Sequence, residues 1–186
     1  MKKLQDLKDR RILLDTNVLI KAADAKKQSQ LHTAFPLFVA RNTITICDTV
    51  YYEFLRNCNM TTYRNRVAWL NSLEPAIPIL CDHQKLFENV WCLYLYALRH
   101  DPRKLLSIEE QDIHIATCAI DEEIDTILTE NYRDFPPALF EKTKIDVSSS
   151  LSLYLMEFKR DLAREYWKEM IACKYKFDVT ATAFKY

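Results

Sequence analysis

The chain has 186 residues, 49% of them hydrophobic and 28% charged, which is typical of a folded domain with a sizeable core. Its 26 Lys and Arg residues balance 26 Asp and Glu residues, so no overall basic field points to nucleic acid, although a local basic patch is compatible with this balance. Glycine is absent, and this excludes a phosphate-binding P-loop, a dinucleotide-binding glycine turn and an EF-hand loop.

The first predicted unit is a strand followed by a helix. Ile12, Leu13 and Leu14 form an apolar run that suits a strand buried on both faces of a parallel sheet. Asp15 ends this run, and a helix is predicted to begin near Asn17. The unit therefore places a carboxylate at the carboxyl end of a strand, the edge where open α/β sheets bind ligands.

Further strands and helices alternate along the chain. A strand over Thr43–Cys47 precedes a helix over Thr49–Cys58, in which Glu53 lies beside the apolar stripe. The remaining patterns predict helices over Gln30–Ala40, Tyr63–Leu73 and Asp82–His100, and strands over Ala76–Leu80, Asp125–Thr129 and Lys144–Val147. This alternation predicts a three-layer α/β/α fold with a mainly parallel central sheet.

A capping box sets the register of one later helix. Ser107 and Glu110 fit the two positions of the box, which predicts a helix over Ile108–Ile120. In this register Asp112 lies in the second turn, on the stripe that faces the core. A buried carboxylate requires a cation, a metal ion or a network of hydrogen-bond donors, so Asp112 is a candidate site residue.

From Leu151 onward, the spacing of Leu155, Phe158, Leu162 and Tyr166 predicts an amphipathic C-terminal helix. We therefore divide the chain into a domain over 1–148 and a helical extension over 149–186 that packs on the domain or on a partner. The six cysteines form no metal-binding pair, and no segment resembles a signal peptide or a membrane span. We expect a reducing, cytoplasmic protein without a membrane partner.

Oxygen-bearing side chains from four separate segments are expected to converge at the carboxyl edge of the sheet. They are Asp15, Glu53, Asp112 and the pair Asn131 and Asp134. Carboxylates gathered in this way repel one another unless a divalent cation neutralises them, and a set without His or Cys favours Mg²⁺ or Mn²⁺ over Zn²⁺. Such a site suits metal-activated attack of water on a phosphodiester.

At this point the sequence resembles the PIN-domain nucleases. The motifs that carry the resemblance are Asp15-Thr16-Asn17, Glu53 within 50–55, Asp112 within 112–119, and the segment 129–135. Their order and spacing agree with the family over roughly Arg11 to Val147. The resemblance implies a PIN-like fold, an endoribonuclease dependent on Mg²⁺ or Mn²⁺, and a homodimer. Many small members resemble toxins of toxin–antitoxin pairs, which implies an antitoxin protein as a partner.

The resemblance also implies roles for individual residues. Catalytic roles fall to the acids Asp15, Glu53, Asp112 and Asp134. Metal binding falls to Asp15, Glu53 and Asp112, with either Asn131 or Asp134 completing the set. Supporting roles fall to Thr16, Asn17 and Thr129, and the candidate RNA contacts are Arg64, Arg66 and Arg133. Glu130 stands where the family commonly has a basic residue, and Arg133 is a candidate to replace that charge.

Two other functions compete with the nuclease hypothesis. The first is a non-catalytic PIN-like scaffold that binds RNA or a protein, suggested by Glu130 and the C-terminal extension. The second is a haloacid-dehalogenase-like phosphatase, which also begins with a strand that ends in Asp. That chemistry requires a second acid two residues later, where this chain has Asn17. We therefore rank the phosphatase last.

Overall fold

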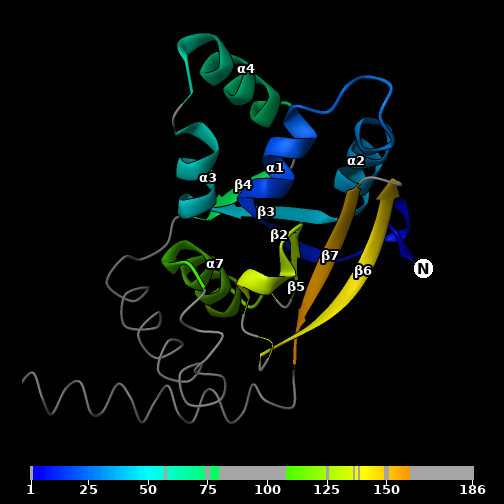
Figure 1. Cartoon of the computed structure of the whole chain (residues 1–186), viewed down its shortest axis with the longest axis vertical. Coiled ribbons are helices and arrows are strands. Elements are labelled where there is room, and N and C mark those ends of the chain that lie inside the picture. The colour runs from blue at the N-terminus through cyan, green and yellow to red at the C-terminus, as the bar shows by residue number, and fades with distance from the viewer. Residues whose placement is uncertain are drawn as a thin grey trace, which may run out of the picture.

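The computed structural model describes residues 2–56, 58–73, 76–79, 108–124, 126–135, 137, 139–148 and 151–159. These residues form one seven-stranded sheet with helices around it (Figure 1). The strands are β1 (Lys2–Lys3), β2 (Arg11–Leu14), β3 (Thr43–Cys47), β4 (Ala76–Ile79), β5 (Thr126–Thr129), β6 (Phe140–Ser148) and β7 (Leu151–Phe158). The α-helices are α1 (Thr16–Ala23), α2 (Gln30–Arg41), α3 (Asp48–Leu55), α4 (Met60–Asn71) and α7 (Glu110–Asp121). The described residues also form two 3₁₀ turns, η1 (Leu4–Asp6) and η2 (Tyr132–Asp134).

The sheet has the strand order β1-β6-β7-β5-β2-β3-β4. β7 is antiparallel to both of its neighbours, whereas the other strand pairs are parallel. The predicted α/β fold with a mainly parallel sheet is therefore confirmed. In Figure 1, α1 and α2 lie on one side of the central strands, and α7 lies on the other side.

The register of the central strands brings their carboxyl ends together. Leu13 pairs with Thr45 of β3 on one side and with Ile127 of β5 on the other. Asp15 and Glu130 each follow the last residue of one of these parallel strands. The polar residues after β2, β3 and β5 therefore meet at one edge of the sheet, as the strand–helix alternation predicts.

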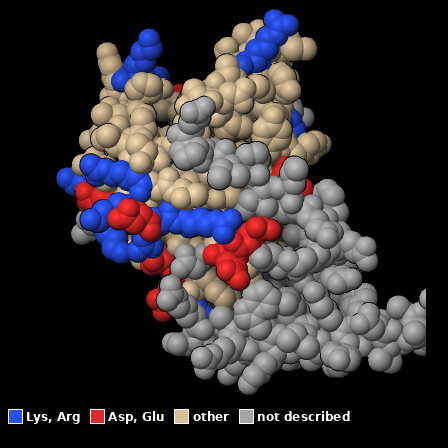
Figure 2. Space-filling view, turned by 180° about the vertical axis from the view of Figure 1, so that it is seen from behind, with Lys and Arg blue, Asp and Glu red and all other residues tan. Residues whose placement is uncertain are grey.

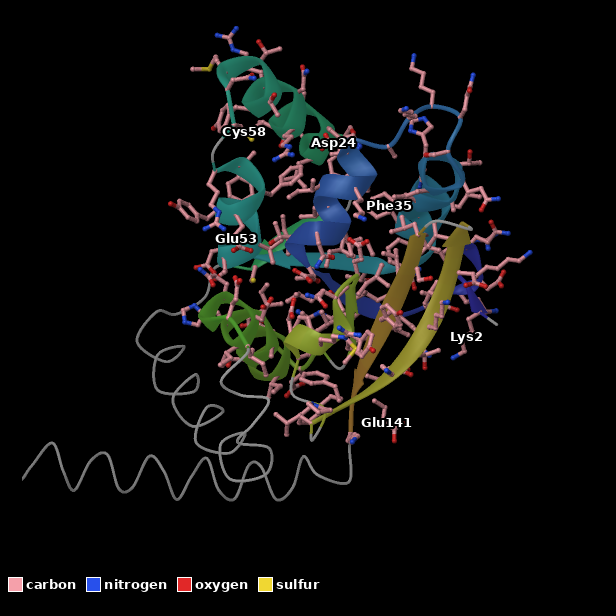
Figure 3. The ribbon with its side chains drawn as sticks, in the orientation of Figure 1. Lys2, Asp24, Phe35, Glu53, Cys58 and Glu141 are labelled. Carbon is pink, nitrogen blue, oxygen red and sulfur yellow. The ribbon has the colours of Figure 1, made fainter. Side chains whose placement is uncertain are left out.

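Apolar packing fixes the helices that surround this edge. The side chains of β2 and β5 are buried apart from Arg11, so both faces of these strands are covered. On the helical side, the Trp69 ring of α4 packs between Phe35 of α2 and Phe54 of α3, with both centroid distances at 5.9 Å. Figure 3 shows Phe35 pointing from α2 toward this cluster. Phe35 and Phe54 are buried and Trp69 is partly buried, so this aromatic packing gives α3 and α4 a defined position beside α1.

This chain forms its helix ends and turns without glycine. Polar side chains cap two helices, and two other residues adopt left-handed backbone conformations. The side chains of Ser29 and Asn59 accept hydrogen bonds from the first turns of α2 and α4. Asp9 and Glu123 adopt left-handed backbone conformations, with φ of 56° and 55°. Glu123 follows the C-cap of α7, where a left-handed residue is common and glycine is the usual choice.

The structure corrects two predictions about elements. Leu151 to Phe158 form a strand inserted between β6 and β5, so the helix predicted from Leu151 is wrong for these residues. α7 begins at Glu110 and has Glu109 as its N-cap, which places Asp112 in the first turn and not the second. The helix predicted over Asp82–His100 and the chain beyond 159 lie outside the described residues.

Candidate functional site

A cavity of about 330 Å³ opens at the carboxyl edge of the parallel strands. Its lining brings together four of the predicted acids, namely Asp15, Glu53, Asp112 and Asp134. Thr16 and Asn17 also line it, as do Arg56, Arg66 and Glu109. A larger cavity of about 630 Å³ lies between η1, the start of α2 and the end of β6, and among the described residues that line it Asp146 is the one acid. We therefore take the smaller, acidic cavity as the candidate site.

Asp15 is held by a hydrogen-bond network that joins β2 to β5. Its side chain is 3% exposed, and its Oδ2 accepts hydrogen bonds from Thr129 Oγ1 at 2.6 Å and from Asn17 Nδ2 at 2.5 Å. Asn17 Oδ1 in turn accepts from the Glu130 amide at 2.9 Å. Burial raises the pKa of Asp15 to about 6, although these hydrogen bonds oppose the rise. The network fixes the direction of a carboxylate that has lost most of its contact with water.

Glu53 approaches Asp15 from α3. Thr16 Oγ1 donates to Glu53 Oε2 at 2.7 Å, which links the start of α1 to the middle of α3. Figure 3 shows Glu53 on the side of α3 that faces α1. Its other oxygen, Oε1, lies 3.5 Å from Arg56 Nη2. Glu53 is therefore a partly buried carboxylate with one neutral and one charged partner.

Asp112 has the most perturbed carboxyl group of the site. Burial, together with the negative charges of Asp15, Asp134, Glu109 and Glu53, raises its pKa to about 8. Among the described residues, no ion pair with Lys or Arg is found for Asp112. Its position in the first turn of α7 favours a negative charge, because the amide dipoles of a helix point toward its N-terminus. A bound cation at this position would reduce the repulsion between Asp112 and the neighbouring acids.

The two candidates after β5 occupy different positions. Asp134 lines the acidic cavity, and burial followed by the charge of Glu109 raises its pKa. Asn131 is exposed, and its Nδ2 donates a hydrogen bond to Asp134 Oδ2. The structure thus brings Asp134 to the cavity and places Asn131 behind it, as a residue that orients the Asp134 carboxylate.

Sequence reasoning missed Glu109 as a member of the site. Glu109 is the N-cap of α7 and lines the acidic cavity, where its charge raises the pKa of both Asp112 and Asp134. The capping box predicts Ser107 as the N-cap, and Glu109 then lies inside the predicted helix. In a helix that starts at Glu110, Glu109 and Asp112 are three residues apart and lie on the same side of the helix end.

The predicted RNA contacts have different environments. Arg64 is exposed on α4, whereas the guanidinium of Arg66 lies over the Phe54 ring and donates to Phe54 O at 2.7 Å. Arg133 is exposed, and its guanidinium lies 5.9 Å from the Tyr132 ring. On the described part of the face in Figure 2, acidic and basic side chains are interspersed and form no continuous basic surface. The basic residues in the described lining of the cavity are Arg56 and Arg66.

Glu130 does not leave an unpaired negative charge beside the site. Lys21 on α1 forms an ion pair with Glu130, with Nζ contacting Oε1. Thus the residue that stands in place of the family's basic group is paired with a lysine from the helix that follows β2.

The donor chemistry of the cavity fits a hard divalent cation. Every candidate ligand is an oxygen donor, and burial together with repulsion from the other acids raises the pKa of Asp112. In the described part of the chain, however, no three Asp, Glu, His or Cys side chains surround a common point closely enough to hold a metal ion. The acids would have to move toward one another to coordinate one ion together.

The sheet is mostly parallel, and acids gather at the carboxyl ends of its strands. The molecule is therefore an α/β protein with an acidic site at that edge. The chain belongs to the PIN domain family, whose model matches residues 12–137. The family is in general one of nucleases, and these nucleases typically use divalent metal ions. This matched range contains all the acids of the site.

Comparison with solved structures gives a likeness to the crystal structure of VapBC2 from Rickettsia felis bound to a DNA fragment from their promoter. The identity is 22% and the TM-score is 0.48, over 65% of this chain and 88% of that chain. A likeness at this level carries no inference about function. No protein with a curated description matches the chain. Among the described helices, none is long and apolar enough to cross a membrane.

Proposed function

We propose that this protein is an endoribonuclease that depends on Mg²⁺ or Mn²⁺ and hydrolyses RNA phosphodiester bonds. The observation that carries the proposal is the gathering of Asp15, Glu53, Asp112 and Asp134 in one cavity at the carboxyl edge of the sheet. Membership of the PIN family supports a nuclease, and the oxygen-only donor set supports a hard metal ion.

The four acids would hold the ion, with Asn131 orienting Asp134 from behind. When bound, the ion supplies an activated water and stabilises the oxygen that leaves the phosphorus atom. Thr129 and Asn17 hold Oδ2 of Asp15 in a fixed direction. Burial and the neighbouring acids raise the pKa of Asp112 to about 8, so this carboxyl group would hold a proton at neutral pH in the metal-free protein and would release it to solvent if a cation bound.

Cleavage of a mixed-sequence RNA with Mn²⁺, with Mg²⁺ and with EDTA tests the proposal. We expect cleavage with either metal and none with EDTA, and we expect Asp15→Asn and Asp112→Asn to reduce the rate at least about 100-fold. Asp146→Asn is the matched control, because Asp146 is also near a strand end but lines the other cavity. Unchanged cleavage by folded Asp15→Asn and Asp112→Asn variants would contradict the proposed site.

A non-catalytic scaffold that binds RNA or a protein is the second candidate. One observation favours it: Arg56 contacts Glu53 at 3.5 Å, so a basic side chain already balances one of the acids. Calorimetry separates the two candidates. Absence of Mn²⁺ binding together with tight binding of RNA would support the scaffold, whereas Mn²⁺ binding that requires Asp112 would support the nuclease.

We also propose that the protein acts as the toxin of a toxin–antitoxin pair and forms a homodimer in a cytoplasmic setting. The order of the four motifs, which carries the resemblance to the toxin-type members of the family, supports this role. Induced expression in a bacterial host should arrest growth with the parent protein and not with Asp112→Asn. Equal growth of both cultures, at equal protein levels, would contradict the toxin role without affecting the nuclease proposal.

A further inference from the structure

The two arginines that line the acidic cavity differ in what holds them. The Arg66 guanidinium donates to Phe54 O at 2.7 Å and to Cys58 Sγ at 3.2 Å. These acceptors are uncharged and belong to the packing between α3 and α4, so Arg66 keeps them whatever charge the cavity carries. Arg56 has no such anchor among the described residues, where the polar contact of its side chain is the ion pair with Glu53. The position of the Arg56 guanidinium therefore depends on an acid of the site.

Glu53 uses its two oxygens differently. Thr16 Oγ1 donates to Oε2 at 2.7 Å, whereas Oε1 lies 3.5 Å from Arg56 Nη2. Oε1 is therefore the oxygen for which a metal ion and Arg56 are alternative partners. A divalent cation has twice the charge of a guanidinium and approaches a carboxylate oxygen more closely, so it is the stronger partner. Since the side chain of Arg56 is 44% exposed, its pair with Glu53 is weak enough to be displaced.

The backbone at Arg56 allows its side chain to change partner without a change in fold. Helix α3 ends at this residue, whose amide donates to Tyr52 O at 2.8 Å and whose backbone is extended, with φ of −67° and ψ of 155°. The Cα of Arg56 is thus anchored beside the cavity, and its guanidinium moves by rotation about side-chain bonds alone. Exposed side chains make such rotations within nanoseconds, far faster than an enzyme turns over.

We propose, on the basis of the proposed nuclease function, that Arg56 and a divalent cation compete for Glu53, and that the released Arg56 binds a phosphate of the RNA at the acidic cavity. The planar guanidinium presents paired N–H donors that match two phosphate oxygens, which suits Arg56 to this role. The competition also couples the two ligands. Arg56 is free for RNA in the protein whose Glu53 holds the cation, and it is occupied by an acid in the protein whose Glu53 does not.

Calorimetric titration of Mn²⁺ into the full chain tests the competition. Arg56→Gln removes the competing charge, so we expect this variant to bind Mn²⁺ about 3- to 10-fold more tightly than the parent protein. In a Glu53→Gln background the ion pair is already broken, and Arg56→Gln should then change Mn²⁺ affinity less than about twofold. This double-mutant cycle separates the contact itself from the general effect of a positive charge near the site.

Lys21→Gln is the matched control. The side chain of Lys21 is 41% exposed and is paired with Glu130, much as Arg56 is paired with Glu53. Neither Lys21 nor Glu130 is among the described residues that line the acidic cavity. Loss of this lysine should therefore change Mn²⁺ affinity less than about twofold, although it removes the same charge from a neighbouring ion pair.

Steady-state cleavage of a mixed-sequence RNA at saturating Mn²⁺ tests the phosphate contact. We expect Arg56→Gln to raise KM about 5- to 20-fold, because a charged hydrogen bond to the RNA is lost, and to change kcat less than KM. Arg56→Lys keeps the charge without the planar fork and should recover part of the loss. The expected effects on the two ligands have opposite signs, whereas a merely structural role for Arg56 would weaken the binding of both.

Three results would each overturn the inference. They are Mn²⁺ binding by Arg56→Gln that is no tighter than that of the parent, an equal gain from Arg56→Gln in the Glu53→Gln background, and a KM for RNA that Arg56→Gln leaves unchanged. Failure of the proposed nuclease function looks different, because the parent protein would then bind Mn²⁺ and leave RNA intact. The phosphate contact would fall with the nuclease in that case, and the calorimetric cycle would still decide the competition for Glu53.

Discussion

Thr129, the last residue of β5, donates a hydrogen bond from Oγ1 to Oδ2 of Asp15, the residue after β2, over 2.6 Å. The same Oγ1 accepts a hydrogen bond from the Asn131 amide at 3.0 Å. One hydroxyl therefore connects the two central strand ends and the loop that carries Asp134. Because Asp15 is buried, this donor largely determines how well its negative charge is tolerated.

Thr129→Val keeps the shape of the side chain and removes the hydroxyl. We expect Mn²⁺ binding to weaken about tenfold and the protein to lose about 1–3 kcal/mol of stability, because a buried carboxylate loses a donor. Calorimetry and urea denaturation measure the two effects. Thr45→Val, at a buried threonine of β3, is the control for metal affinity. Equal Mn²⁺ affinity in Thr129→Val and the parent would contradict a supporting role for Thr129.

Asp112 makes the stability of the metal-free protein dependent on pH. Its pKa rises from 3.8 to about 8 on folding, chiefly through burial, so between these values the folded state holds a proton that the unfolded state has released. Stability must then fall as the pH rises through this window.

We compare the free energy of unfolding of Asp112→Asn with that of the parent at a pH of about 5 and of about 9. The variant should gain roughly 1–2 kcal/mol relative to the parent as the pH rises, which is less than the full pKa shift implies because water screens part of the effect. Urea midpoints in EDTA at both pH values give the comparison. A constant difference between variant and parent would show that Asp112 titrates normally. Asp146→Asn, away from the acidic cavity, should follow the parent at both pH values.

Glu123 holds a left-handed conformation after α7, with φ of 55°. The Ile124 amide donates to Ala119 O at 2.7 Å and the Glu123 amide to Ile120 O at 3.1 Å, the two hydrogen bonds of a Schellman cap. We expect Glu123→Gly to stabilise the protein by about 1 kcal/mol, since glycine adopts this conformation without a Cβ clash. Thermal denaturation measures the gain. Glu122→Gly, at the right-handed residue before it, should have the opposite sign.

Arg66 connects three segments beside the acidic cavity. Its Nη1 donates to Phe54 O at 2.7 Å and to Cys58 Sγ at 3.2 Å, and its Nη2 lies 3.4 Å from Asp24 Oδ2. Figure 3 shows Cys58 between α3 and α4, and Asp24 at the end of α1.

Arg66→Met should cost about 2 kcal/mol of stability, mostly through the lost hydrogen bond to the Phe54 carbonyl, because the exposed Asp24 contributes little. Arg64→Met removes an exposed arginine of the same helix and should change stability by less than about 0.5 kcal/mol. Equal urea midpoints for the two variants would show that Arg66 does not hold these segments together.

The central part of the fold follows from local sequence patterns. The runs that form β2, β3 and β5 are short, apolar and followed by Asp or another polar residue, which indicates both the strand and the edge at which it ends. Because parallel strands share that edge, the convergence of Asp15 and Asp134 could be predicted without coordinates.

The C-terminal strand could not be predicted in the same way. In β7, Leu151 and Leu155 fit a helical spacing, yet Leu153 between them is buried as well, and the alternation of Leu151, Leu153 and Leu155 suits a strand. The two patterns cannot be separated locally. β7 pairs with β6, which is adjacent to it in the sequence, and with β5, which is farther away. This pairing within one sheet favours the strand over the helix.

The helix start near Glu109 shows a similar limit. Ser107 and Glu110 satisfy the local rule for a capping box, but the helix begins at Glu110. The helix begins two residues later than the capping box predicts. Asp112 therefore lies in the first turn, and Glu109 lies at the N-cap and not inside the helix. Packing of α7 against α3 and β5, which the sequence does not display, determines where such a helix begins.

The central claim is that the acids of the cavity together bind a divalent metal ion, and titration of Mn²⁺ into metal-free protein tests it most directly. Calorimetry should give saturable binding to the parent protein and to Asp146→Asn, and at least about tenfold weaker binding to Asp112→Asn and Asp15→Asn. Equal Mn²⁺ binding by all four proteins, or no binding by the parent, would contradict the claim.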